Sequence, residues 1–260
     1  MASRVRPTVG RSASYVEPVR VPGSEGDGSS DAADGRVETS DERLAAFAGQ
    51  VTHDLKTPLT TMSLSLELIR DELEDGATAE DVLPLVTRAL RGSARMLAMI
   101  EDVLAFARVG TSIDPVPVDL AKVSADVIAD LGSALDGVEV VVGDLPVVPG
   151  DETLLRVLLL NLLGNALKFR CPDRPLEVAV TAHRAGAGSW RLEVVDNGIG
   201  IPEADRERVF EPMLRLDKRV EGLGIGLATC RRVVDAHGGT IGVVDNPAGA
   251  GSVLWVELPS

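Results

Sequence analysis

The 260-residue chain lacks long apolar segments. Its apolar runs are short, such as residues 157–160 (VLLL), whereas a membrane-spanning helix needs about 18 or more consecutive apolar residues. Arginines occur near the N-terminus, but no apolar core follows them, so the sequence has no signal-peptide pattern. We therefore expect neither a membrane span nor a secretory leader.

Basic residues and cysteines are also scarce. The chain has 26 Lys and Arg against 40 Asp and Glu, a net charge of −14 at pH 7. This balance argues against nucleic-acid binding, which needs a basic surface. Any phosphate ligand should be small and held by backbone amides or a metal. Cys171 and Cys230 follow no disulfide or metal pattern, which indicates free thiols in a reducing compartment. The composition predicts a cytoplasmic protein.

The first two parts of the chain differ in composition. Residues 1–40 are rich in Gly, Ser, Pro and acidic residues, and we expect them to be disordered. Residues 41–112 are predicted to form a hairpin of two long helices. The first covers 41–74, and a capping box of Thr78 and Asp81 marks the start of the second. Apolar residues recur every three or four positions in both helices, the first at positions 44, 47, 51, 55, 59, 62, 66, 69 and 73.

The second helix also carries leucines on its flank, at positions 90, 97 and 104. A single hairpin cannot cover these leucines together with its own seam, because the second helix then has apolar residues on two faces. We therefore expect a homodimer in which two hairpins form a four-helix bundle.

The third part, residues 116–260, mixes helices and strands. The patterns predict helices at about 120–135, 151–169 and 225–237, and strands at 138–142, 176–184, 190–196, 240–244 and 252–258. Strands with tight connections indicate a mixed or antiparallel sheet covered by helices. The expected fold class is thus a helical hairpin followed by an α/β sandwich.

The most informative segment is residues 51–59 (VTHDLKTPL). His53 lies off the apolar stripe of its helix and should face solvent, where a neutral imidazole has a ring nitrogen free to act as a nucleophile. Pro58 has no N–H for the carbonyl of Asp54, which loosens the helix beside the histidine. The alternative is an ordinary surface histidine. The other histidines, His183 and His237, are expected to be solvated or structural.

Asn161, Asn165 and Lys168 share one face of an otherwise leucine-rich helix. Amide oxygens can hold a hard cation such as Mg²⁺ that bridges phosphates. The alternative is that these asparagines make only local hydrogen bonds.

Two further segments favour a nucleotide site. Residues 196–200 (DNGIG) follow a predicted buried strand, so Asp196 can accept a hydrogen bond from a base while Gly198 and Gly200 let the backbone approach it. Residues 222–228 (GLGIGLA) begin a helix, where amides and the helix dipole favour phosphate. Taken singly, the first segment could be a simple turn and the second is a weak signal.

In this order, the segments resemble the two-component sensor histidine kinases. The resemblance covers roughly residues 41–259 and rests on five boxes: residues 53–59 (H box), 161–169 (N box), 196–200 (G1 box), 209–212 (F box) and 222–228 (G2 box). Gly251 and Ser252 resemble the closing glycine motif of the family. The resemblance implies a dimerisation and phosphotransfer hairpin followed by a Bergerat-type ATP-binding domain.

The resemblance also implies roles for individual residues. His53 would be the phosphoacceptor, Asp54 its acid–base partner, and Asn165 the Mg²⁺ ligand. Nearby, Asn161 and Lys168 would lie at the phosphates of ATP. Asp196 would bind adenine, and the wall on the phosphate side would consist of the glycines Gly222, Gly224 and Gly226.

The implied activity is ATP-dependent autophosphorylation of His53, with transfer to an aspartate of a separate response regulator. Thr57 lies three residues after Asp54, the family pattern linked to dephosphorylation of the regulator; alternatively, its hydroxyl bonds back to the carbonyl of His53. No folded sensor is recognisable before residue 41, so a separate sensor protein is one candidate source of the input.

Three departures from the family pattern keep alternatives open. Met213 and Leu214 replace the usual aromatic pair after the F box, Leu223 replaces a small residue, and the short lid resembles the phytochrome-type branch. One alternative is a non-catalytic adaptor or phosphatase with a weakened ATP site. Another is a related ATPase or serine kinase, against which the His53 hairpin argues.

Overall fold

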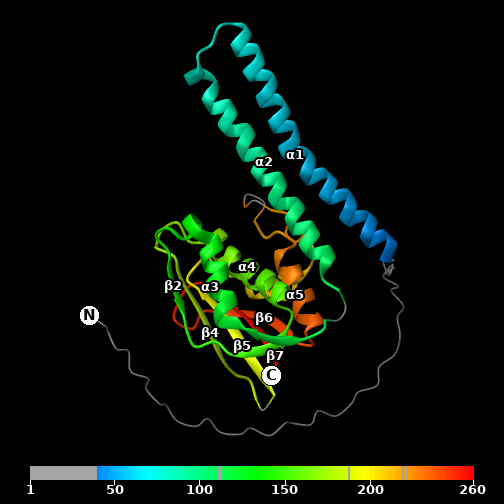
Figure 1. Cartoon of the computed structure of the whole chain (residues 1–260), viewed down its shortest axis with the longest axis vertical. Coiled ribbons are helices and arrows are strands. Elements are labelled where there is room, and N and C mark those ends of the chain that lie inside the picture. The colour runs from blue at the N-terminus through cyan, green and yellow to red at the C-terminus, as the bar shows by residue number, and fades with distance from the viewer. Residues whose placement is uncertain (1–39, 111–112, 187, 218–219, 221) are drawn as a thin grey trace, which may run out of the picture. The chain divides into compact units, whose positions relative to one another are not determined.

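The computed structural model describes residues 40–110, 113–186, 188–217, 220 and 222–260. The disorder expected for residues 1–40 lies outside the described residues, except at Ser40, which begins the first helix. Two long helices, α1 (Ser40–Glu74) and α2 (Ala79–Arg108), pack side by side as a hairpin (Figure 1). The predicted capping box is confirmed, since the backbone N–H of Thr78 donates to Asp81 Oδ2 at 2.9 Å. None of the described helices is long and apolar enough to cross a membrane.

The seam of the hairpin repeats every seventh residue. Its buried positions are Pro58 and Ser65 on α1 and Val82, Ala89, Gly92 and Met99 on α2. A Cβ on Gly92 would lie 2.8 Å from Met62 Cγ, so this glycine permits a close helix approach. Part of the predicted α1 stripe does not belong to the seam, because Leu59, Leu66 and Leu73 are exposed. The stripe is wider than one partner helix can cover.

The remaining residues form an α/β sandwich around a five-stranded sheet of order β2-β4-β5-β7-β6. β2 pairs parallel with β4 and all other pairs are antiparallel, so the predicted mixed sheet is confirmed. The strands are β2 (Glu139–Val142), β4 (Glu177–Arg184), β5 (Ser189–Asp196), β6 (Thr240–Asp245) and β7 (Ser252–Pro259).

Three helices cover one face of this sheet: α3 (Leu120–Leu131), α4 (Glu152–Lys168) and α5 (Gly226–Ala236) (Figure 1). The leucines of α4 form the centre of the core; Leu155, Leu158 and Leu159 are fully buried. Short 3-10 turns lie at Gly132–Leu135, Glu203–Asp205 and Arg208–Phe210. Cys171 and Cys230 are both free thiols, as predicted.

Two predictions about local structure were wrong. The helix expected over 120–135 ends at Leu131, because Gly132 takes a positive φ of 45° and the chain continues as a 3-10 turn. A two-stranded antiparallel ribbon of β1 (Val116–Asp119) and β3 (Val147–Gly150) was missed. Each strand has only four residues and contains a proline, so neither shows a readable alternation.

Candidate functional site

His53 lies on the outside of α1 with 75% of its side chain exposed, as predicted. Its Nδ1 is 3.1 Å from Asp54 Oδ1, which also accepts a hydrogen bond from Gln50 Nε2 at 3.0 Å. Partial burial disfavours the ionised form of Asp54, but hydrogen bonds from His53 and Gln50 and the charge of Arg215 hold the pKa of this carboxyl below its usual value. An ionised Asp54 keeps the proton on Nδ1 and leaves the lone pair on Nε2.

Thr57 lies beside His53 in a shallow groove that Lys56, Thr60 and Thr61 complete. The hydroxyls of Thr60 and Thr61 donate to the carbonyls of Lys56 and Thr57, at 2.9 and 3.1 Å. Among the residues that the structure describes, the hydroxyl of Thr57 has no hydrogen-bond partner. The alternative hydrogen bond from this hydroxyl to the carbonyl of His53 is therefore not formed. The Thr57 hydroxyl is available to a ligand in the groove.

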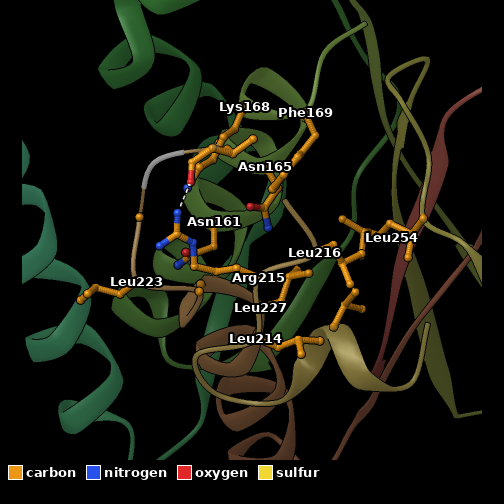
Figure 2. A pocket seen from close by; sticks show the side chains of 18 of the residues that line it. Asn161, Asn165, Lys168, Phe169, Leu214, Arg215, Leu216, Leu223, Leu227 and Leu254 are labelled. Atoms are coloured by element: carbon orange, nitrogen blue, oxygen red, sulfur yellow. Dashed lines mark hydrogen bonds between the residues drawn. The ribbon is translucent and has the colours of Figure 1, made fainter. Parts of the chain in front are cut away.

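A cavity of about 560 Å³ lies in the sandwich, next to α4 and the loop that precedes α5 (Figure 2). It brings together all but one of the predicted nucleotide-site residues: Asn161, Asn165, Lys168, Asp196, Gly200, Gly222, Gly224 and Gly226. Gly198 does not line it but supports Asp196 from behind. The α4 side chains lie toward one end and Leu216 and Leu254 toward the other (Figure 2).

The two amides of α4 differ in their hydrogen bonding. Asn161 Nδ2 donates to the carbonyl of Val157 at 2.9 Å, and its Oδ1 is so close to Gly226 that a Cβ there would lie 2.6 Å away. The Nδ2 of Asn165 is buried without a partner in the described part of the chain. A buried amide without a partner costs free energy, and here it lines a cavity. This arrangement fits a polar ligand.

Asp196 ends β5 and is only 9% exposed. Its Oδ1 accepts the backbone N–H of Gly198 at 2.8 Å and that of Ser252 at 3.3 Å. Burial raises the pKa of this carboxyl, and the two backbone donors oppose the rise. No hydrogen bond reaches Oδ2 from the residues described, so this oxygen can accept one from a ligand.

The glycines of residues 222–226 are required by their backbone and surroundings. Gly222 and Gly224 have positive φ angles of 125° and 72°. A Cβ on Gly222 would lie 2.5 Å from Lys168 Nζ, and one on Gly224 would lie 2.6 Å from the carbonyl of Leu214. The loop thus runs against both Lys168 and the segment after the F box.

Two of the departures from the family pattern meet in one apolar cluster. Leu223 is buried with Met99 of α2 and Ile225, and the partly buried side chain of Met213 packs against them. Met213 also has the positive φ of 67° that is unusual for a non-glycine residue, and its N–H donates to the carbonyl of Gly224 at 2.9 Å. Both departures therefore have a packing role.

Several residues of the site were not found from the sequence. Asn246 donates to the backbone carbonyl of Asp196 at 2.9 Å, and Arg174 donates to the carbonyls of Asn197 and Gly198 at 2.7 and 2.9 Å. Glu101 and Asp102 of α2 line the cavity. Burial raises the pKa of Asp102, the charge of Lys168 opposes this rise, and Glu101 adds to it. No local sequence signal connects these residues to the site.

The helical hairpin with its exposed histidine and the sandwich with its cavity each match a known protein family. Residues 43–112 match the His Kinase A (phospho-acceptor) domain. Residues 150–260 match the family of histidine kinase-, DNA gyrase B-, and HSP90-like ATPases.

Comparisons with individual proteins point to the same families. The phytochrome-like protein Cph1 of Synechocystis is 32% identical over 86% of this chain, and the chain spans only 30% of the length of that relative. It is 32% identical to the solved mycobacterial sensor histidine kinase MprB, with a TM-score of 0.52, covering 56% of this chain and 97% of that one. The chain belongs to the two-component sensor histidine kinases. Its fold also resembles that of the kinase ThkA, solved in complex with the response regulator TrrA (20% identity, TM-score 0.64, 84% and 63% covered).

Proposed function

We propose that this protein is an ATP-dependent kinase that phosphorylates its own His53 and then passes the phosphoryl group to an aspartate of a response regulator. The observation that carries the proposal is the exposed imidazole whose Nδ1 is bound to Asp54. Nε2 attacks the γ-phosphorus of ATP, the bond to the β,γ-bridging oxygen breaks, and ADP leaves. Asp54 stabilises the positive charge that develops on the ring.

The nucleotide occupies the cavity in this proposal. Asp196 Oδ2 accepts a hydrogen bond from the adenine amino group, Gly200 lets the backbone approach the base, and Gly198 holds Asp196 Oδ1 from outside the cavity. At the other end, Lys168 and Asn161 meet the phosphates together with the amides of residues 222–226. Asn165 Oδ1 would hold Mg²⁺, which would neutralise phosphate charge. The unpartnered Nδ2 of Asn165 supports a polar ligand at this position.

The hairpin offers surfaces for two partners, a second copy of the chain and a response regulator. We propose that residues 41–112 form the interface of a homodimer, because Leu90 and Leu97 are 65% and 59% exposed on α2. Residues 116–260 then form the catalytic domain of each copy. The groove around Thr57 would meet the regulator, and its free hydroxyl would orient a water for dephosphorylation. The complex found for ThkA supports such a partner. Because the reaction consumes ATP, the proposal places it in the cytoplasm.

A labelling experiment with γ-labelled ATP tests the assignment of His53. His53→Gln should abolish labelling and leave ATP binding unchanged, whereas His183→Gln, the matched control at an exposed strand position, should label normally. The wild-type label should be lost in acid and kept in base, as expected of a phosphoramidate. A labelled His53→Gln protein, or an acid-stable label, would refute the proposal.

The magnesium site is tested separately. Asn165→Ala should weaken ATP binding at least tenfold with Mg²⁺ present and change it little when Mg²⁺ is chelated. ATP binding without any labelling of the wild type would favour the adaptor.

A further inference from the structure

The turn after β5 presents two consecutive peptide units to Asp196 and α4. The N–H of the first unit, from Gly198, donates to Asp196 Oδ1 at 2.8 Å. The N–H of the second unit, from Ile199, donates to the carbonyl of Phe169 just after α4, at 3.0 Å. In a trans peptide the C=O points opposite to the N–H. The two carbonyls of these units, from Asn197 and Gly198, therefore point away from the cavity.

Arg174 binds both of these outward carbonyls. Its Nε donates to the carbonyl of Asn197 at 2.7 Å, and its Nη2 donates to that of Gly198 at 2.9 Å. The guanidinium is a rigid planar fork, so two bonds to adjacent carbonyls fix the orientation of both peptide planes. A charged donor on the C=O also polarises the peptide and strengthens the hydrogen bond of its N–H.

Other contacts hold this turn but do not replace the fork. The side chain of Asn197 donates to the carbonyl of Pro175 at 3.1 Å and accepts the N–H of Glu177 at 3.0 Å. These bonds anchor Asn197 to the start of β4. They do not reach the peptide between Asn197 and Gly198, whose N–H binds Asp196 and whose C=O binds Arg174. A Cβ on Gly198 would lie only 2.5 Å from the carbonyl of Phe169, so this peptide lies close against the end of α4.

We propose that Arg174 is a positioning residue for nucleobase recognition. By holding the two carbonyls it aims the N–H of Gly198 at Asp196 Oδ1, and this bond leaves Oδ2 directed at the ligand. The inference rests on the proposed function, in which Asp196 accepts the amino group of adenine. It adds a residue that contacts neither nucleotide nor phosphoacceptor and that no box of the family pattern contains.

The test compares ATP with inosine triphosphate, which carries a carbonyl in place of the amino group. In the full chain, Arg174→Ala should weaken ATP binding about tenfold and inosine triphosphate binding less than twofold, so that the discrimination between them falls. Arg174→Lys keeps the charge but not the fork, and should restore less than half of the lost discrimination. The matched control is Arg184→Ala, which removes an arginine stacked on Trp190 at the opposite end of β4.

A second measurement needs no nucleotide. Amide hydrogen exchange at Gly198 and Ile199 should accelerate in Arg174→Ala and stay unchanged in Arg184→Ala. Parallel losses for both nucleotides, unchanged discrimination, or unchanged exchange at Gly198 would overturn the proposal.

Asp196→Asn distinguishes a failure of the role proposed for Arg174 from a failure of the proposed adenine contact. If Asp196→Asn abolishes discrimination while Arg174→Ala leaves it intact, the role of Arg174 is wrong and the nucleotide site stands. If Asp196→Asn leaves discrimination unchanged, the proposed adenine contact is wrong, and the inference about Arg174 is overturned with it.

Discussion

His237 is expected to stabilise the sandwich domain without any part in phosphoryl transfer. It is 8% exposed at the end of α5, where its Nδ1 lies 2.7 Å from the carbonyl of Val233. Its Nε2 accepts the backbone N–H of Asp151 at 3.0 Å. Asp151 is the N-cap of α4 and accepts the N–H of Leu154 through its side chain. The imidazole thus joins the end of one helix to the start of the other.

The cost of His237→Ala follows from these two bonds. Truncation leaves the N–H of Asp151 without a partner and removes one donor from the carbonyl of Val233, which keeps the backbone N–H of residue 237; together these losses cost about 2 kcal/mol. The missing ring adds about 1 kcal/mol, because Gly150 and Leu155 beside it close the space only in part. We expect the free energy of unfolding to fall by about 3 kcal/mol.

Urea unfolding followed by the fluorescence of Trp190 and Trp255, the two tryptophans of the chain, measures this change. His183→Ala is the control: its side chain is exposed late in β4, and the loss should stay below about 0.5 kcal/mol. A loss below about 1 kcal/mol for His237→Ala would refute its role in stability. If the variant remains folded but His53 is no longer labelled, the claim that His237 takes no part in phosphoryl transfer is refuted.

Three further predictions concern the candidate site. Because burial raises the pKa of Asp196 above its usual 3.8, acidification should weaken ATP binding at a higher pH than an ordinary aspartate would, and calorimetric titration of Asp196→Asn should lack this step. Thr57→Ala should slow decay of the regulator's acyl phosphate and spare labelling of His53. The control Thr87→Ala, on α2 outside the groove and with its hydroxyl bonded to the carbonyl of Leu83, should change neither; equal loss of both activities in Thr57→Ala would contradict the assignment. Leu223→Ala should lower the free energy of unfolding by about 3 kcal/mol, since Leu223 is 1% exposed against Met99; a change below about 1 kcal/mol in urea unfolding would contradict its packing role.

The features predicted from the sequence are those that depend on local spacing. The 3.6-residue period placed His53 outside and put Asn161, Asn165 and Lys168 on one face, and the helix geometry follows directly from that period. The turn and glycine signals likewise located Asp196 and residues 222–226. The characteristic residues of these segments lie close together in the sequence, so a single sequence suffices to find them.

The features that were missed depend on pairing between distant segments. β1 and β3 are separated in the sequence by α3, a 3-10 turn and β2, and their register appears in no local pattern. Arg174 reaches the turn after β5 only because β4 and β5 lie side by side. The split of the α1 stripe has the same origin. Which positions of α1 are covered depends on how α2 packs against it, a property of the partner helix.

The cavity and the core place opposite demands on stability. Asp196 is a buried carboxylate with a raised pKa, so its ionisation costs stability as the pH rises through that pKa. Asn165 has a buried amide nitrogen without a partner among the described residues. Such costs persist where they serve a ligand. Asp196→Asn should therefore retain or raise the free energy of unfolding while losing base discrimination, the reverse of His237→Ala. A strong destabilisation by Asp196→Asn, measured in urea, would mean that the carboxylate serves the fold rather than the nucleotide.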